Sequence, residues 1–293
     1  MVILVTGASG QVGKSFQSLT HRMPEAQWTF TEKNQLDIRS KTAVADFLGH
    51  LKPDVIINAA AYTAVDNAEE ERELAEEVNA EGPANLAACC KGTAAQLIHY
   101  STDYVYHNTI NRPLRETDPT QPLSFYGKTK LSGEKKALDQ FPDCTIIRTS
   151  WVYAPMGNNF VLKMLSLADK NAVLKVIDDQ IGTPTLASDL AEATIDLIQG
   201  QGDGRGDYRG QIFNYSNEGV CSWFDFAKAI FELTNKNQEV IPIPSSEFPS
   251  KAQRPFYSLM SKEKIRGCLS KGIPHWRDSL QKCIQQIGLY HEK

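Results

Sequence analysis

The sequence predicts an α/β protein in which helices cover both faces of a doubly wound parallel sheet. Two observations predict this fold class, and the composition and length are compatible with it. Short β-branched runs alternate with helical patterns through the first half of the chain, and a glycine-rich loop follows the first run. The composition, with 41% hydrophobic and 23% charged residues, is ordinary for a globular protein. At 293 residues the chain can form a large cofactor domain and a smaller lobe.

The first half of the chain contains the elements that such a sheet requires. Val12, Phe16 and Leu19 fall on one face of the helix that would follow the first strand. Pro53 stops a second helical stretch, and Pro83 should either kink a third helix or open a new one. The predicted strands span 2–5, 28–31, 55–57, 97–100 and 145–149, and the predicted helices span 12–19, 42–51, 67–90 and 125–138.

The pattern loosens in the second half. We predict strands at 173–177 and 212–215, and helices at 186–198 and about 276–287. Residues 200–210 are rich in glycine and aspartate and indicate an exposed turn. Ser222 and Asp225 resemble a capping pair at the start of another helix. Four prolines at 242, 244, 249 and 255 indicate a long irregular segment.

These elements suggest two parts. We expect a dinucleotide-binding domain of residues 1–150 plus about 186–214, and a substrate-binding lobe of about 151–185 and 215–293.

Charge and cysteine content narrow the class of protein. The formal net charge of −4 gives no basic face for a nucleic acid. The six cysteines have no metal-ligand spacing, which favours reduced thiols. The apolar run at the N-terminus is too short for a signal peptide, and no stretch is long enough for a membrane span. We therefore expect a cytoplasmic protein.

The glycine-rich loop contains Gly7, Gly10 and Gly13 between the first strand and the first helix. Glycine is needed where the chain turns sharply, where backbone approaches a pyrophosphate and where helix packs on strand. The loop therefore predicts a Rossmann-like cofactor site, although a tight structural turn is the simpler alternative. Glu32 lies where an acid often binds the adenine ribose, and Lys33 beside it could accept a 2′-phosphate, so the choice between NAD and NADP stays open.

Tyr126 and Lys130 are four residues apart and share a face of a predicted helix. A nearby ammonium favours the phenolate and lowers the pKa of a tyrosine, which makes it a usable proton donor for a carbonyl being reduced. Thr102 directly follows the strand at 97–100, at the edge where ligands bind open parallel sheets. We predict these three residues to be catalytic. Exposed helices also carry Tyr and Lys at this spacing, so the pair alone is weak evidence.

An ordered set of blocks then resembles the dTDP-4-dehydrorhamnose reductases, a family of extended short-chain dehydrogenases. The match covers nearly the whole chain. The blocks are TGASGQVG (6–13), LDI (36–38), PDVIINAAAYTAVDNAE (53–69), VNAEGPANLA (78–87), HYSTDYVY (99–106), ETDPTQPLSFYGKTKLSGE (116–134), RTSWVY (148–153), GNNFV (157–161), DQIGTPT (179–185) and RP-x-x-S-L (254–259).

The resemblance implies reduction of the C4 keto group of dTDP-4-dehydro-L-rhamnose by NADPH or NADH. It implies that Tyr126 protonates the C4 oxygen, that Lys130 holds the nicotinamide ribose and that Thr102 binds the reacting oxygen. The implied cofactor-binding residues are Gly7, Gly10, Gln11, Val12, Gly13, Asp37, Ile38, Ala59, Ala60, Ala61, Thr63, Tyr126 and Lys130. The implied substrate-binding residues are Thr102, Asp103, Trp151, Asn159, Thr185 and Arg254.

Several alternatives stay open. Small residues at 59–61 could serve only helix packing, Trp151 could be a core residue, Arg254 could be a solvated charge, and Asp103 could cap a turn. His107-Asn108 stands where the family commonly carries Asp or Gly, which affects the rim of the site. No carboxylate set matches the Mg²⁺ site of some relatives, so we predict no metal.

The protein could also reduce another keto-sugar nucleotide, or be a non-catalytic subunit like the β subunit of methionine adenosyltransferase. A homodimer is compatible with the sequence, which does not fix the oligomeric state.

Overall fold

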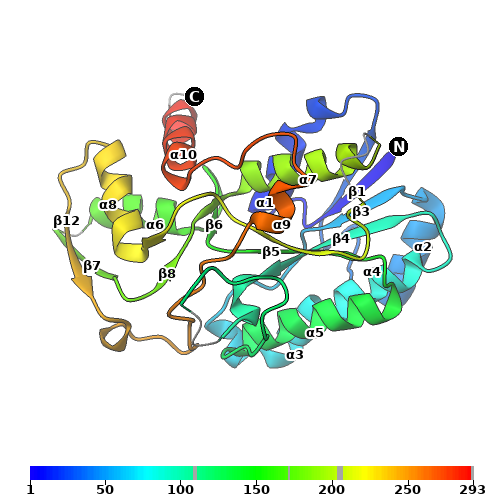
Figure 1. Cartoon of the computed structure of the whole chain (residues 1–293), viewed down its shortest axis with the longest axis horizontal. Coiled ribbons are helices and arrows are strands. Elements are labelled where there is room, and N and C mark those ends of the chain that lie inside the picture. The colour runs from blue at the N-terminus through cyan, green and yellow to red at the C-terminus, as the bar shows by residue number, and fades with distance from the viewer. Residues whose placement is uncertain (108–110, 171, 203–206, 292–293) are drawn as a thin grey trace.

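A six-stranded parallel sheet forms the larger part of the molecule in the computed structural model, which describes residues 1–107, 111–170, 172–202 and 207–291 (Figure 1). The strands are β1 (Val2–Thr6), β2 (Gln27–Thr31), β3 (Val55–Asn58), β4 (Gln96–Thr102), β5 (Thr145–Thr149) and β10 (Ile212–Tyr215). Their order is β10-β5-β4-β3-β1-β2, and every neighbouring pair is parallel. β2 lies on one side of β1, and β3, β4 and β5 follow in sequence order on the other side, which confirms the predicted doubly wound sheet.

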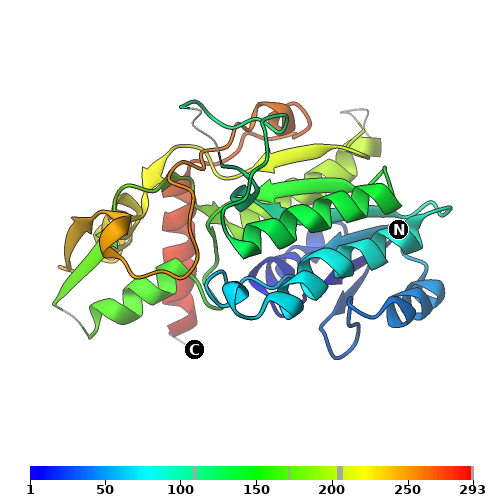
Figure 2. The ribbon, with the colours of Figure 1, turned by 90° about the horizontal axis from the view of Figure 1, so that it is seen from below.

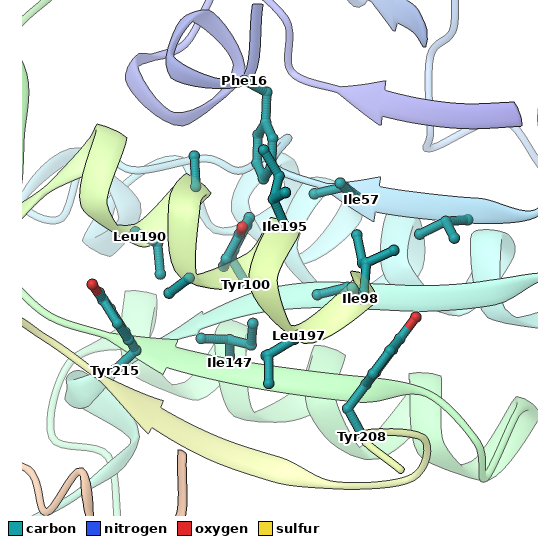
Figure 3. Close-up of a cluster of buried hydrophobic side chains, with 14 of the residues drawn as sticks. Phe16, Ile57, Ile98, Tyr100, Ile147, Leu190, Ile195, Leu197, Tyr208 and Tyr215 are labelled. Carbon is teal, nitrogen blue, oxygen red and sulfur yellow. The ribbon is translucent and has the colours of Figure 1, made fainter. Parts of the chain in front are cut away.

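Helices cover both faces of this sheet, as predicted. Figure 1 shows α1 (Gln11–Ser18) and α7 (Ala187–Gly202) on one face, and α2 (Lys41–Leu51), α4 (Gly82–Cys90) and α5 (Phe125–Gln140) on the other. The strands alternate accordingly. Ile57 faces the cluster that contains Phe16 and Ile195 (Figure 3), whereas its neighbour Ile56 packs with Leu48 on the opposite face. Burial on both faces explains the near-continuous apolar runs in the strand sequences.

A second apolar cluster builds a smaller lobe next to the end of β5 (Figures 1 and 2). Phe226 and Trp276 lie near its centre, with their rings edge to face at 5.9 Å. The lobe contains β6 (Val152–Tyr153), α6 (Phe160–Ala168), β7 (Val173–Ile177), β8 (Ile181–Gly182), β9 (Thr185–Leu186), β11 (Cys221–Ser222), α8 (Trp223–Leu233), β12 (Glu239–Ile243) and α10 (Trp276–His291). The capping pair predicted for α8 is confirmed, because Ser222 and Asp225 form a reciprocal capping box.

The structure corrects parts of the second half. The proline-containing segment is not irregular from its start, because Pro242 lies within β12, which pairs in parallel with β7. β12 is an edge strand of a two-stranded sheet, where a missing N–H can be tolerated. Helix α6 was not predicted. Ile265, in the short helix α9 (Glu263–Arg266), packs against the core of the main sheet, within a stretch that we assigned to the lobe.

The loop at 200–210 is also less exposed than expected. Helix α7 continues to Gly202, and residues 203–206 lie outside the described part of the chain. Tyr208 is 2% exposed and packs in the sheet core (Figure 3). All six cysteines are free thiols, as predicted. Within the described ranges, no helix combines the length and apolar character needed to cross a membrane.

Pro83 does not start a separate helix, because the chain stays helical from Arg72 to Cys90 and Pro83 follows a π-helical turn within that stretch. The stretch at 67–90 contains α3 (Arg72–Glu76), one turn of π-helix (Glu77–Glu81) and then α4, with Pro83 in the first turn of α4. Pro83 has no N–H to donate to the carbonyl of Asn79 four residues earlier. Helix α5 crosses at this point, and a Cβ added to Gly133 would lie 2.0 Å from the Asn79 oxygen. The absence of a side chain at Gly133 therefore sets how closely α5 approaches the sheet.

We expect Gly133→Ala to destabilise the protein by about 2 kcal/mol or more, because the added methyl group meets a backbone oxygen that cannot move freely. Gly49→Ala is the matched control. Gly49 also lies within a helix, but an added Cβ meets nothing within 4 Å, so this change should be neutral or should stabilise by about 0.5–1 kcal/mol. Urea denaturation of both variants measures the difference. Equal stabilities would show that the approach at Gly133 imposes no constraint.

Candidate functional site

The glycine loop closes against the end of β3 at the point where the strand order reverses. Gly7 has a φ of +69°, and a Cβ there would lie 2.7 Å from the backbone of Ala59. A Cβ on Gly13 would lie 2.4 Å from the Gly7 oxygen, so α1 also packs directly on the loop. Gly10 is the N-cap of α1 and provides no side-chain cap, which leaves first-turn N–H groups available. This backbone arrangement fits a bound pyrophosphate.

A cavity of about 360 Å³ lies beside this loop. Two charged residues at the end of β2, Glu32 and Lys33, line it, as does Arg39. Seven of the predicted cofactor residues also belong to its wall: Gly7, Gly10, Asp37, Ile38, Ala59, Ala60 and Ala61. The other predicted residues on this side lie outside the wall: Gln11, Val12 and Gly13 form the first turn of α1, and Thr63 is exposed beyond the alanine run.

The charges on this wall are largely paired. The Arg39 guanidinium binds Asp37 at 2.7 Å and Glu77 at 3.0 Å. The hydrogen bond from Arg39 is the main reason that the pKa of Asp37 is lowered. Lys33 is exposed and has no ion pair among those the structure describes. The cavity wall therefore carries both acidic and basic side chains.

Tyr126 and Thr102 meet at the carboxyl edge of the sheet. Thr102 ends β4, and its hydroxyl donates to Asp103 Oδ1 at 3.1 Å. Tyr126 lies in the first turn of α5, where Ser124 caps the helix. A Cβ on Gly127 would lie 2.5 Å from the Tyr104 oxygen, so α5 packs closely on the turn that follows β4. This packing brings the Tyr126 hydroxyl close to the Thr102 hydroxyl.

The expected lowering of the Tyr126 pKa is not found in the chain by itself. Burial is the largest influence and raises the pKa of Tyr126 to about 12, while the hydrogen bond with Thr102 lowers it and the charge of Asp103 raises it. The expectation was wrong because the Lys130 ammonium is directed elsewhere, to the Tyr100 carbonyl oxygen at 2.6 Å. Tyr126 consequently keeps its proton at neutral pH, as a proton donor must.

Lys130 is itself buried, with 2% of its surface exposed. Burial lowers its pKa to about 8, although the nearby Glu134 carboxylate opposes the change. Its Nζ also lies 3.4 Å from Nε2 of His99, and His99 Nδ1 lies 3.0 Å from the Asn58 amide nitrogen. The Asn58 oxygen in turn accepts from Thr6 at 2.7 Å. Burial, with the charge of Lys130 as a second cause, holds the pKa of His99 well below its usual value. A buried polar chain therefore connects the strand before the glycine loop to Lys130.

Two predicted substrate residues, Trp151 and Thr185, lie in the lobe just beyond β5. Trp151 has a φ of +47°, unusual for a bulky side chain, and its ring stacks on Trp223 at 3.6 Å. Thr185 donates its N–H to the Trp151 carbonyl, and its own buried hydroxyl has no partner within the described chain. An unpaired buried hydroxyl is a candidate ligand contact.

Asn159 and Arg254 make most of their contacts within the chain. Asn159 caps α6, and its amide nitrogen donates to Gln11 at 2.9 Å and to two backbone carbonyls. Asn159 thus connects the glycine-loop helix to the lobe, and its contact with substrate stays a prediction. Arg254 forms an ion pair with Asp66 at 2.8 Å, and its side chain is 21% exposed. Arg254 is therefore not a solvated charge.

Sequence reasoning missed Asn58, His99, Asp66 and Tyr104. Asn58 and His99 lie at or near strand ends within apolar runs, and a polar residue in a buried strand is the signal that could have identified them. Asp66 gave no such signal, because its partner is 188 residues away. His107 is described, but its neighbour Asn108 lies outside the described residues. In the described ranges, no three His, Cys, Asp or Glu side chains are grouped as they would be around a metal.

Comparisons with known proteins agree with this geometry. The model of the RmlD substrate binding domain family matches residues 1–289. The spore coat polysaccharide biosynthesis protein SpsK of Bacillus subtilis is 38% identical and covers 97% of each chain. A dTDP-4-dehydrorhamnose reductase of Salmonella typhimurium is 37% identical and covers 98% of each.

Two solved structures are also similar over nearly their whole length. A dTDP-4-dehydrorhamnose reductase from Clostridium acetobutylicum has a TM-score of 0.90 and 39% identity, covering 98% of this chain and 100% of that one. A reductase of the same name from Bacillus anthracis, in complex with NADP, has a TM-score of 0.90 and 35% identity, covering 97% and 99%.

Asp103 is buried beside Thr102, and this burial should make stability depend on pH. Burial raises the pKa of Asp103 from 3.8 to about 7, against hydrogen bonds from Ser258 and Thr102. Between these two values the folded protein holds a proton that the unfolded chain releases, so the free energy of unfolding falls as the pH rises from about 4 to 7. This decline in the free energy of unfolding, on the order of 2 kcal/mol or more, should be absent in Asp103→Asn. Urea denaturation of both proteins at the two ends of this pH range tests the prediction. The same dependence of unfolding free energy on pH in the variant and the wild type would contradict it.

Proposed function

The chain belongs to the RmlD substrate binding domain family, and we propose on that basis that it uses NADPH or NADH to reduce the C4 keto group of dTDP-4-dehydro-L-rhamnose to dTDP-L-rhamnose. One observation carries the proposal to this chain's own residues. The Tyr126 hydroxyl lies close enough to the Thr102 hydroxyl to be influenced by it, at the carboxyl edge of β4, in the same sheet whose β1 and β3 ends form the glycine-loop crevice. Ligands of open parallel sheets bind at this edge.

The catalytic roles follow from what each group can do. The keto oxygen accepts from the hydroxyls of Tyr126 and Thr102, and the Thr102 proton turns to it from Asp103 Oδ1. Tyr126 transfers its proton to that oxygen as carbon C4 is reduced, and becomes a phenolate. Burial keeps the proton on Tyr126 until this moment, because the hydroxyl has a pKa of about 12 in the chain alone. Lys130 is held on the Tyr100 carbonyl oxygen, and its positive charge, four residues along the same helix, would stabilise the new phenolate.

The residues around the glycine loop fit a dinucleotide. The loop leaves no room for side chains at Gly7 and Gly13, and first-turn N–H groups of α1 are available for a pyrophosphate. The neighbouring cavity has room for an adenosine between Asp37, Ile38 and the alanines at 59–61. When bound, the reduced nicotinamide supplies the hydride. Glu32 favours a ribose hydroxyl and Lys33 a 2′-phosphate, so these residues are compatible with either cofactor.

The substrate would bind between the sheet edge and the lobe. We assign Asp103, Trp151, Asn159, Thr185 and Arg254 to its binding, since the Arg254 guanidinium suits a diphosphate and the Thr185 hydroxyl is buried without a partner in the described chain. The free cysteines and the need for a reduced nicotinamide cofactor support a cytoplasmic location.

An absorbance assay tests the proposed activity. The protein is incubated with NADPH or NADH and dTDP-4-dehydrorhamnose, and the loss of reduced cofactor is followed. We expect turnover with this sugar and not with other keto-sugar nucleotides. Turnover with another sugar nucleotide only, or none with any keto sugar, would overturn the proposal.

Tyr126→Phe should lower kcat by about 10²–10⁴-fold, because the positioned proton donor is lost. The dissociation constant of NADPH, measured by fluorescence titration, should stay within about twofold of wild type, since the phenyl ring keeps the shape of the site. A Phe variant with a near-normal rate would remove Tyr126 from the mechanism.

The pH dependence should report Lys130. Burial lowers its pKa to about 8, so the ammonium is lost as the pH rises through this value, and kcat/KM should fall there. Tyr126 cannot cause this decline, because its pKa is about 12. Lys130→Arg keeps the charge to a higher pH and should move the decline upward. Measuring kcat/KM from pH 6 to about 10 tests this, and the same profile in both proteins would exclude Lys130 as the titrating group.

A further inference from the structure

We propose that Asp66 is a positioning residue for the sugar nucleotide, because its carboxylate holds Arg254 in place at the substrate site. The inference rests on the proposed function, in which Arg254 binds the diphosphate. Asp66 lies in the loop after β3, on the sheet side of the site, whereas Arg254 lies in the proline-containing loop that follows β12. No feature of the sequence pattern singled out Asp66.

The Asp66 carboxylate collects donors from one short segment, residues 250–254. Arg254 donates from Nη2 to Oδ2 at 2.8 Å and from Nη1 to Oδ1 at 3.3 Å. The N–H of Ala252 donates to Oδ1 at 3.0 Å, and the hydroxyl of Ser250 donates to the same oxygen at 3.1 Å. All these donors are 184 to 188 residues away in the sequence. One side chain therefore fixes both a guanidinium and the backbone that carries it.

This pair is partly shielded from water. The Arg254 side chain is 21% exposed and the Asp66 side chain 41%. Desolvation acts to raise the pKa of Asp66, but the hydrogen bonds from Arg254 and Ala252 outweigh it, and the net pKa is lowered. Asp66 thus stays ionised at neutral pH. A two-point contact between guanidinium and carboxylate also fixes the plane of the guanidinium, which a single contact would not.

The contact extends to the catalytic tyrosine. The Arg254 guanidinium lies close to the hydroxyl of Tyr104: burial raises the pKa of Tyr104, and the positive charge of Arg254 opposes this rise. The ring of Tyr104 meets the ring of Tyr126 edge to face, with centroids 5.5 Å apart and planes at 80°. Asp66, Arg254 and Tyr104 therefore form a continuous support from the β3 loop to the residue that donates the proton.

Two roles for Asp66 predict opposite results. If the carboxylate only masked Arg254, it would compete with a diphosphate, and removing its charge would strengthen nucleotide binding. The contacts favour presentation instead. Asp66 also accepts hydrogen bonds from Ala252 and Ser250, and these bonds hold the loop that carries Arg254. A carboxylate that bound Arg254 only to mask it would not need them. Asp66 uses two of the five N–H donors of the guanidinium, and Ser250 and Ala252 accept from Nη1, so the donors that remain for a phosphate lie on Nε and Nη2.

The test uses Asp66→Asn in the full chain, with dTDP and thymidine as probes and isothermal titration calorimetry as the measurement. Asparagine can still accept from Ala252 but loses the charge that aligns Arg254. We expect the affinity for dTDP to fall about tenfold or more, and the affinity for thymidine to stay within about twofold, because only the diphosphate needs Arg254. In kinetics, KM for the sugar nucleotide should rise more than kcat falls. NADPH affinity should be unchanged.

Glu70→Gln is the matched control. Glu70 binds Lys251 at 2.6 Å across the same two segments, but both side chains are more than half exposed. Removing this charge should leave dTDP affinity within about twofold, since exposed ion pairs contribute little. Asp66→Glu keeps the charge and should recover part of the affinity lost in Asp66→Asn. In the double variant Asp66→Asn/Arg254→Ala, dTDP should bind no more weakly than in Arg254→Ala alone, because Asp66 acts through Arg254.

Each contrary result has a distinct meaning. If wild-type protein binds no dTDP, the proposed function fails. If wild type binds dTDP and Asp66→Asn binds it equally or more tightly, the positioning role of Asp66 fails while the proposed function stands. An equal loss of dTDP and thymidine affinity in Asp66→Asn would also overturn the inference, because it would indicate general damage to the site. Should Asp66→Asn not fold, Asp66→Glu decides: wild-type dTDP affinity despite the shifted carboxylate would contradict the need for this geometry.

Discussion

The burial of a lysine ammonium at the carboxyl edge of β4 constrains the whole site. A charge in that position needs close partners, and Lys130 has the Tyr100 carbonyl oxygen at 2.6 Å and His99 within 3.4 Å. To bring Lys130 there, α5 must lie almost against the sheet. Gly133 and Gly127 permit this approach, one at the Asn79 carbonyl and the other at the Tyr104 carbonyl. The same helix placement sets Tyr126 next to Thr102.

Buried polar side chains also connect the strands below the site. Thr6, Asn58 and His99 connect the ends of β1, β3 and β4 below the crevice. Arg148 and Glu134 form a second buried pair behind Lys130, with their closest atoms 2.6 Å apart. Buried polar groups of this kind are costly unless every one is paired. Their presence under one edge of the sheet indicates that the geometry at this edge is fixed before a ligand arrives.

Local patterns predicted much of the fold. The β-branched runs marked the main strands, and Ser222 with Asp225 marked a helix start, because strand burial and helix capping depend on neighbouring residues. The pair Tyr126 and Lys130 was recognisable for the same reason. The pKa of Tyr126 was not, because it depends on burial and on where the Lys130 side chain points. The pairing of Pro242 in β12 and the contact of Asp66 with Arg254 depend on segments far apart in the sequence.

The position of β10 in the sheet has a consequence for biosynthesis. The chain leaves the sheet after β5 and returns to pair with it only at Ile212–Tyr215, after an excursion of more than sixty residues. While a ribosome is still making that excursion, the outer edge of β5 has no partner within the sheet. Unpaired strand edges attract other chains. The nascent polypeptide is therefore vulnerable to aggregation during this interval, which ends when β10 becomes the edge strand, because the side chains of Glu116 and Lys264 bind its Asn214 N–H and Ile212 carbonyl.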